Sequence, residues 1–203
     1  MPRDKTANHI KIIAAAKAEF MEMGFDKSSM RSISKRCGMT AAGIYRHCVD
    51  KADLFDQIVA PAVDRINAWL DAHVARYVDA VHHEERIQWR DSEIDMMREI
   101  IIYPNMEEYH LLLAKSRGSK YEHFLHDLTE GQQAQLLQYL PMLKAQGYAV
   151  KDIDSKELHL LLSAYTTALF EPVIHNYSVE EALHCLKAVE AFFVPGWKQL
   201  FGF

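Results

Sequence analysis

The stretch Gly38–Lys51 reads GMTAAGIYRHCVDK, and its first half consists almost entirely of Gly, Ala and Thr. Its second half carries four hydrogen-bond donors: Tyr45, Arg46, His47 and Lys51. Such donors bind phosphate oxygens, and an arginine can also pair bidentately with guanine. A free helix N-terminus adds unpaired N–H groups, which favour an anion. The stretch therefore predicts a slim helix that meets a phosphate-rich polymer.

Two short helices joined by a tight turn would position these donors. Ser28 or Ser29 can cap the first helix, and apolar residues recur at helical spacing over residues 30–37. Gly38 permits a sharp turn, and Thr40 can cap the second helix. This pattern indicates a helix-turn-helix, whose second helix enters the major groove of DNA while the first crosses the phosphate backbone.

The second helix, over residues 41–47, has to enter a groove about 12 Å wide, so its leading end must be slim. Phosphate contacts are predicted for Tyr45, His47 and Lys51. Base reading is predicted for Thr40, Ala41, Gly43 and Arg46, because Arg pairs with guanine and Ala can touch a thymine methyl. Ser29 and Arg31 of the first helix complete the predicted DNA-binding set.

The order of residues from Gly24 to Phe55 closely resembles the DNA-binding head of the tetracycline-repressor (TetR) family. The resemblance spans about residues 12–55. The matching positions are Gly24-Phe25, Ser28-Ser29, Gly38, Thr40, Ile44-Tyr45-Arg46-His47 and Lys51. Cys48 departs from the pattern, because the family usually has Phe there. A tolerated substitution is favoured over a redox role for this thiol.

The resemblance implies an all-α homodimer of about nine helices that represses transcription and leaves its DNA operator when a small molecule enters its body. It also implies a four-helix dimer interface made by the last two helices of each subunit, here about residues 155–176 and 179–194. Their apolar residues would form its seam: Leu158, Leu161, Leu162, Tyr165, Leu169, Val173, Leu183, Leu186, Val189 and Phe193.

The formal net charge of −5 is unevenly distributed along the chain. Residues 1–51 hold ten Lys and Arg against five Asp and Glu, whereas residues 52–203 hold thirteen against twenty-three. A basic head on an acidic body suggests that only the head meets a polyanion. We therefore expect a helix-turn-helix DNA-binding domain over residues 1–50 and a helical ligand-binding and dimerisation domain over residues 51–203.

The composition favours a soluble cytoplasmic helical protein. Hydrophobic residues make up 49% of the chain, and Gly and Pro are few. No apolar run approaches the ~20 residues that span a bilayer, and the N-terminus has no apolar core typical of a secretory signal. The three cysteines fit free thiols in a reducing compartment.

Helical periodicity continues along the whole chain, and no strand pattern competes with it. The predicted helices outside the helix-turn-helix cover residues 5–23, ended by Gly24; 51–81, capped by Asp50 and kinked or interrupted at Pro61; 92–103; a helix capped by Asn105; 121–145; 155–176, capped by Asp154 or Ser155; and 179–194, with a capping box from Ser178 to Glu181 and a stop at Pro195-Gly196.

The body is expected to contain a mostly apolar ligand pocket with a few polar groups. Candidates are Trp89, Met96, Met97, Ile100, Tyr103, Tyr109, Leu113, Tyr121, Phe124, Tyr165, Phe170 and His175. Methionine and aromatic stripes are more often core than pocket, so only about a third of these are expected to touch a ligand.

A second hypothesis keeps the helical fold and makes the body a metal or haem sensor, or a helical-bundle enzyme. His123 and His126 lie three residues apart on one helix face, and His110 would supply a third ligand. The sequence has no HExxH motif, no CxxC motif and no glycine-rich phosphate loop. The favoured expectation is therefore no catalytic residue, no cofactor and no metal.

Overall fold

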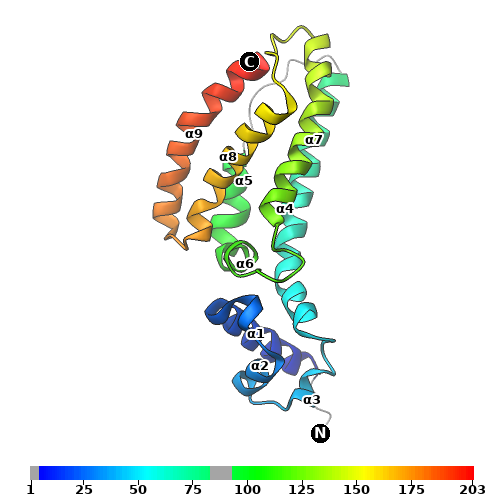
Figure 1. Cartoon of the computed structure of the whole chain (residues 1–203), viewed down its shortest axis with the longest axis vertical. Helices are drawn as coiled ribbons and strands as arrows, with labels where there is room; N and C mark the ends of the chain where they lie inside the picture. Colours follow the sequence, from blue (N-terminus) through cyan, green and yellow to red (C-terminus); the bar gives the residue numbers. More distant parts are fainter. Residues whose placement is uncertain (1–4, 83–92) are drawn as a thin grey trace. The chain divides into compact units, whose positions relative to one another are not determined.

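The computed structural model describes residues 5–82 and 93–203, which fold into helices with no strand among them. The elements in these ranges are α1 (Lys5–Lys27), α2 (Met30–Cys37), α3 (Ala41–Ile44), α4 (Lys51–His82), α5 (Glu93–Met96), the π-helix η1 (Met97–Ile102), α6 (Tyr103–Ala114), α7 (Phe124–Ala145), α8 (Ser155–Ile174) and α9 (Val179–Phe201) (Figure 1). The predicted all-α fold is confirmed.

The chain forms two compact units. The head unit contains residues 1–64 and 107–122, and the body unit contains residues 65–106 and 123–203. Two helices, α4 and α6, begin in one unit and end in the other. The functional division into residues 1–50 and 51–203 stays a prediction, but the head unit as a packed body includes a segment, 107–122, from the middle of the chain.

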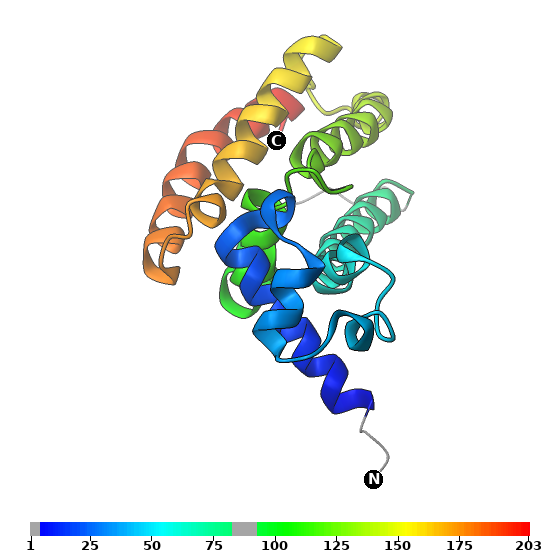
Figure 2. The same ribbon diagram turned by 60° about the horizontal axis from the view of Figure 1, so that its bottom comes forward.

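The core of the head unit is built from helical apolar stripes. Each of α1, α2, α3 and α4 contributes completely buried side chains to it, among them Ile12, Phe20, Ile33, Ile44 and Leu54. The ring of Phe55 packs edge-on against the rings of Phe20 and Phe25, with 5.1 Å between ring centroids in both cases. Figure 2 shows α1, α2 and α3 in shades of blue.

Segment 107–122 is fastened to the head unit by side chains. Lys17 on α1 places Nζ 2.8 Å from an oxygen of Glu107 and 2.8 Å from an oxygen of Glu108. The hydroxyl of Tyr109 donates to the Ala62 carbonyl at 3.0 Å. These contacts explain why residues distant in sequence belong to the same compact unit.

The body unit is a layer of packed helices in which α8 lies between α7 and α9 (Figure 1). Leu158, Leu169 and Val173 on α8 are buried. The ring of Tyr165 lies 5.1 Å from that of Phe193 and 5.8 Å from that of Trp197, measured between centroids. Aromatic contacts of this kind bury large apolar side chains between α8 and α9.

The predicted stop at Pro195 is wrong, because α9 runs through it to Phe201. A proline inside a helix costs about 3 kcal/mol, but each large apolar side chain buried beyond it returns about 1.5–3 kcal/mol. Trp197 and Phe201 are both buried and stack with their centroids 5.7 Å apart. Helix α4 likewise continues through Pro61, where a kink or an interruption was expected.

Two other boundaries differ from the prediction. The helix expected over residues 92–103 is α5 followed by the π-helix η1, with Ser92 outside the described residues. The helix expected to begin at Tyr121 begins at Phe124. Residues 116–122 instead form turns, in which the Tyr121 amide donates to the Ser119 hydroxyl at 3.1 Å.

Candidate DNA-binding surface

The first helix of the helix-turn-helix, α2, is held at both ends by its own residues. The Ser29 hydroxyl accepts from the Ser32 amide at 3.1 Å, and the Ser32 hydroxyl accepts from the Ser29 amide at 3.1 Å. This reciprocal capping satisfies two donors at the N-terminus. At the other end Gly38 adopts φ 64° and ψ 30°, a left-handed conformation that glycine takes without strain.

The second helix, α3, is short, with a cap at its N-terminus and a buried side chain at its C-terminal end. Its N-cap is Thr40, whose hydroxyl accepts from the Gly43 amide at 3.1 Å, as predicted. Regular helix covers only Ala41–Ile44, whereas residues 41–47 were predicted. The Ile44 side chain is completely buried, and its carbonyl accepts from the His47 amide at 2.8 Å. The buried Ile44 side chain thus determines which way the side chains that follow it point.

The predicted DNA-reading residues lie together on α3 and just after it. Tyr45 is 53% exposed, and Arg46 and Ala41 are also exposed. His47 is half-buried, with its ring centroid 6.2 Å from that of His9 on α1. His9 was not among the predicted residues, because it lies 38 positions away along the chain.

Gly43 on α3 has little room for a larger side chain. A Cβ atom added at Gly43 would lie 3.2 Å from the Thr40 hydroxyl oxygen and 3.5 Å from the Met39 methyl carbon. That hydroxyl is the helix cap, so crowding it would disturb the cap. Two other residues predicted to bind DNA, the α2 cap Ser29 and Arg31 within α2, are also exposed.

Lys51 differs from the other predicted phosphate donors, because its ammonium group has partners inside the chain. Its Nζ donates to three backbone carbonyls: Phe25 at 2.7 Å, Ser28 at 3.1 Å and Asp26 at 3.3 Å. The same atom lies 4.3 Å from the centroid of the Phe25 ring. The side chain is half-buried.

Cys48 is buried beneath the same surface. Its thiol lies 3.6 Å from the Ile44 carbonyl oxygen. Burial raises the pKa of the Cys48 thiol to about 11, with smaller contributions from the Asp53 and Asp50 carboxylates. A thiol with such a raised pKa is almost entirely protonated at neutral pH, which makes it a poor nucleophile.

The candidate ligand-pocket residues are divided between the two units. Met96, Met97, Tyr165 and Phe170 are buried in the body unit, where Phe124 is half-buried and His175 is exposed. Tyr109, Leu113 and Tyr121 belong to the head unit, and the hydroxyl of Tyr121 bonds to Asp56 there. Trp89 and the side chains of Ile100 and Tyr103 lie outside the described residues.

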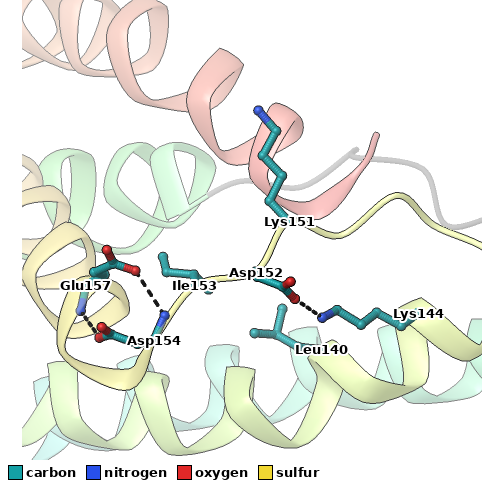
Figure 3. A pocket seen from close by; sticks show the side chains of 7 residues that line it. All are labelled: Leu140, Lys144, Lys151, Asp152, Ile153, Asp154 and Glu157. Carbon is teal, nitrogen blue, oxygen red and sulfur yellow. Dashed lines mark hydrogen bonds and ion pairs between the residues drawn. The ribbon is translucent and has the colours of Figure 1, made fainter.

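A hollow of about 360 Å³ lies where α7 is connected to α8 (Figure 3). Its lining residues are Leu140, Lys144, Lys151, Asp152, Ile153, Asp154 and Glu157. Asp154 and Glu157 cap α8, and Lys144 lies 2.7 Å from Asp152. This polar surface shares no residue with the apolar pocket predicted from the sequence.

The histidines of the metal hypothesis are not brought together as a ligand set. His110 is buried in the head unit, whereas His123 and His126 are exposed in the body unit. His126 lies 3.3 Å from the Glu130 carboxylate. Among the described residues, no three or more His, Cys, Asp or Glu side chains are grouped to hold a metal ion.

The predicted dimer seam is largely core of the single chain. Six of its ten residues are buried without any partner chain: Leu158, Leu162, Tyr165, Leu169, Val173 and Leu186. Leu183, Val189 and Phe193 are half-buried, and Leu161 is exposed. Two apolar residues outside the predicted set are the most exposed on these helices: Leu160 at 68% and Phe192 at 78%.

No helix in the described ranges has the length and apolar character needed to cross a membrane.

Comparison with solved structures supports the fold. The Salmonella enterica protein GusR is 20% identical, with a TM-score of 0.52, and the match covers 98% of both chains. A protein from Pseudomonas aeruginosa PAO1, described as a transcriptional regulator, is 17% identical with a TM-score of 0.51, and the match covers 98% of this chain and 96% of that one. No curated protein matches the sequence.

The helix-turn-helix gives the more specific likeness. Residues 12–58 match the sequence model of the family described as bacterial regulatory proteins, tetR family. This range contains α2, the Gly38 turn, α3 and the start of α4. The head of this chain therefore carries the helix-turn-helix domain of the TetR family of bacterial regulatory proteins.

Proposed function

We propose that the chain is a cytoplasmic, sequence-specific repressor that binds its operator as a homodimer and leaves it when a small molecule enters the body. The single observation that carries DNA reading is the arrangement of α3. Ile44 is buried while Tyr45 and Arg46, which follow it directly, are exposed. The basic balance of residues 1–51 supports a polyanionic partner for this surface.

The proposed roles follow from side-chain chemistry and exposure. Arg46 reads guanine through two hydrogen bonds, and Thr40, Ala41 and Gly43 lie against base edges at the slim end of α3. Tyr45 and His47 donate to phosphates, which sets the register but reads no bases. Ser29 and Arg31 on α2 add phosphate contacts, since the first helix of this motif crosses the backbone.

The proposed dimer uses the outer face of α8 and α9. Because most of the seam predicted from the sequence is buried within one chain, the available apolar side chains are Leu160, Leu161 and Phe192. A two-fold interface must be self-complementary, and exposed apolar residues on two adjacent helices satisfy that requirement.

The proposed inducer is a small, mostly apolar molecule bound in the body unit, beside some of Met96, Met97, Tyr165 and Phe170. These residues offer polarizable and aromatic surface, and Tyr165 adds a polar hydroxyl. A screen of small molecules for those that raise the melting temperature and release the operator tests this part. A molecule that releases DNA without binding the body unit would contradict it.

Selection of bound DNA from random sequence tests the reading function. The expected product is a near-palindrome with half-sites about one helical turn, ~34–36 Å, apart. Arg46→Ala should then relax the preference at one base pair of each half-site, at a cost of ~1–3 kcal/mol. An unchanged preference would remove Arg46 from the reading set, and a failure to enrich any sequence would overturn specific DNA binding.

A further inference from the structure

The end of α1 is broken in a way that exposes carbonyl oxygens. Gly24 has φ 76° and ψ 163°, which is not helical, and the chain turns there before α2 begins. Carbonyls near such a break have lost their partners in the regular helix and carry partial negative charge. The segment 25–28 therefore presents carbonyl acceptors, and the Phe25 carbonyl, which accepts from the Ser28 amide at 3.3 Å, has a second lone pair for another donor.

Lys51 supplies that donor from 23 or more positions further along the chain. An ammonium group has three N–H bonds, and Nζ of Lys51 has three carbonyl acceptors, those of Phe25, Asp26 and Ser28, at 2.7–3.3 Å. Its position 4.3 Å from the Phe25 ring centroid adds a cation–π contact. This geometry uses the full donor capacity of the side chain within the protein.

The link between Lys51 and the reading helix is short and fixed. Lys51 is the first residue of α4, and only residues 45–50 separate it from α3. The Asp53 amide donates to Asp50 at 2.8 Å, and the Val49 amide donates to Asp53 at 2.8 Å. These bonds restrain the backbone just before Lys51, so the place where Lys51 is held also sets where α3 ends.

We infer that Lys51 is a positioning residue for the reading helix, not a phosphate contact. It holds the start of α4, and through it the end of α3, against the broken end of α1. This inference rests on the proposed DNA-binding function and assigns Lys51 a different role in it from the one its residue type predicted.

The same junction also meets the segment that follows α6. The Phe25 amide donates to the Lys115 carbonyl at 2.8 Å. Phe25 thus bonds to both residues: its amide donates to the Lys115 carbonyl, and its carbonyl accepts from the Lys51 ammonium group. Lys51 therefore positions α3 relative to a junction that includes residues from the middle of the chain.

Salt dependence of operator binding separates the two roles of Lys51. Each phosphate contact contributes about 0.9 to the slope of log K against log salt concentration. Lys51→Met keeps the apolar stem and removes the donors. We expect operator affinity about tenfold lower, because charge-assisted hydrogen bonds are lost, with an unchanged salt slope. We also expect faster amide hydrogen exchange in residues 41–50 of the DNA-free protein.

Lys51→Arg is the sharper variant, because it keeps the positive charge and most of the stem. A phosphate contact would survive this change, whereas a planar guanidinium cannot match three carbonyls arranged for an ammonium group. We expect weaker operator binding and faster exchange in residues 41–50 from Lys51→Arg. Wild-type affinity and exchange in this variant would overturn the inference, even if Lys51→Met fails to fold.

Two control variants calibrate the measurement. Arg31→Ala removes an exposed, predicted phosphate contact on α2, so its salt slope should fall by about 0.9 while exchange in α3 stays unchanged. Lys187→Met changes an exposed lysine of the body and should alter neither quantity. A Lys51→Met protein that behaves like Arg31→Ala would contradict the positioning role. If the wild-type protein binds no DNA, the proposed function fails, and hydrogen exchange alone still decides the role of Lys51.

Discussion

Neighbouring residues of α3 and the turn after it have two different roles: some are packed in the core, and others are exposed for contact with DNA. Ile44 and Cys48 are buried four positions apart on the inner side, and Tyr45 and Arg46 between them are exposed. The Cys48 amide donates to the Ile44 carbonyl at 3.3 Å, which keeps the two anchors in helical relation. A buried pair at this spacing holds the exposed donors facing outward.

Cys48 should be chemically inert in the folded protein. With burial raising the pKa of its thiol to about 11, only about one thiol in a thousand is ionised at pH 8, and the thiolate is the reactive form. Iodoacetamide should therefore label Cys48 far more slowly than the half-buried Cys185, as measured by peptide mass spectrometry over time. Unfolded protein serves as the control, since both thiols should react there, and equal rates in the folded state would restore a redox role for Cys48.

Residue type alone identified the donors of this surface but not the direction in which each points. Tyr45 and Arg46 are exposed as a phosphate or base contact requires, whereas Lys51 points into the chain. The acceptors of Lys51 come from the break at Gly24, and no local spacing around Lys51 reveals them. The neighbour of His47, His9, is equally invisible in the local sequence because it comes from another helix.

Four helix beginnings, each marked by a capping side chain, were predictable from sequence, whereas the start of α7 and several helix ends were not. Caps at Ser29, Thr40, Asp154 and Ser178 are present as predicted, because a cap depends on residues within four positions of one another. Whether a proline ends a helix depends on what is buried beyond it. Pro195 fails to end α9 because Trp197 and Phe201 are buried in the body unit.

The cap of α8 offers a direct measure of what such local bonds contribute. The Asp154 carboxylate accepts from the Lys156 amide at 2.7 Å and the Glu157 amide at 2.9 Å, and Glu157 accepts from the Asp154 amide at 3.0 Å (Figure 3). Asp154→Ala should lower the free energy of unfolding by about 1 kcal/mol, measured in urea. Asp154→Asn keeps the acceptor and should lose much less, so equal losses would show that the cap is not responsible.

The turns after α6 should make the stability of the head unit sensitive to acid. Hydrogen bonds from Lys120 and then Tyr121 lower the pKa of Asp56 below its usual value of 3.8, and Lys120 Nζ lies 2.6 Å from the carboxylate. A lowered pKa stabilises the folded state above the unfolded value, and this stabilisation disappears as pH falls through the folded value.

Asp56→Asn should therefore lower the free energy of unfolding at pH 7 by at most about 1 kcal/mol, because the carboxylate is partly exposed. The difference from the wild-type protein should shrink as the pH falls below 3.8. Urea unfolding at pH 7, 5 and 3 measures it, with Asp64→Asn on the same helix as the control. A difference that grows toward acid would have the wrong sign for this explanation.

At the scale of the whole molecule, the net basic segment and the outer face of α8 and α9 lie in different parts of the chain. Residues 1–51 are net basic, and residues 52–203 are net acidic. The largest exposed apolar side chains of α8 and α9 are in the acidic part. A surface of one sign attracts DNA, and an apolar surface favours a second protein chain, so the two associations need not compete.

The outer face of α8 and α9 should therefore hold the dimer together. Leu160 is 68% exposed and Phe192 is 78% exposed, so neither contributes much to the fold of one chain. Leu160→Asp combined with Phe192→Asp should leave the helical signal and the cooperative unfolding of the protein intact. Sedimentation should shift from dimer to monomer, because a two-fold interface repeats each introduced carboxylate on both subunits.

Loss of the dimer should also weaken operator binding, since a palindromic site is held by two heads and each gains from the binding of the other. Leu137→Asp, which changes a 39% exposed leucine on α7, is the matched control and should stay dimeric with full operator affinity. A double variant that remains dimeric would place the interface elsewhere. A monomer that keeps full affinity for the palindrome would show that one head is sufficient, and would remove the reason for a two-fold operator.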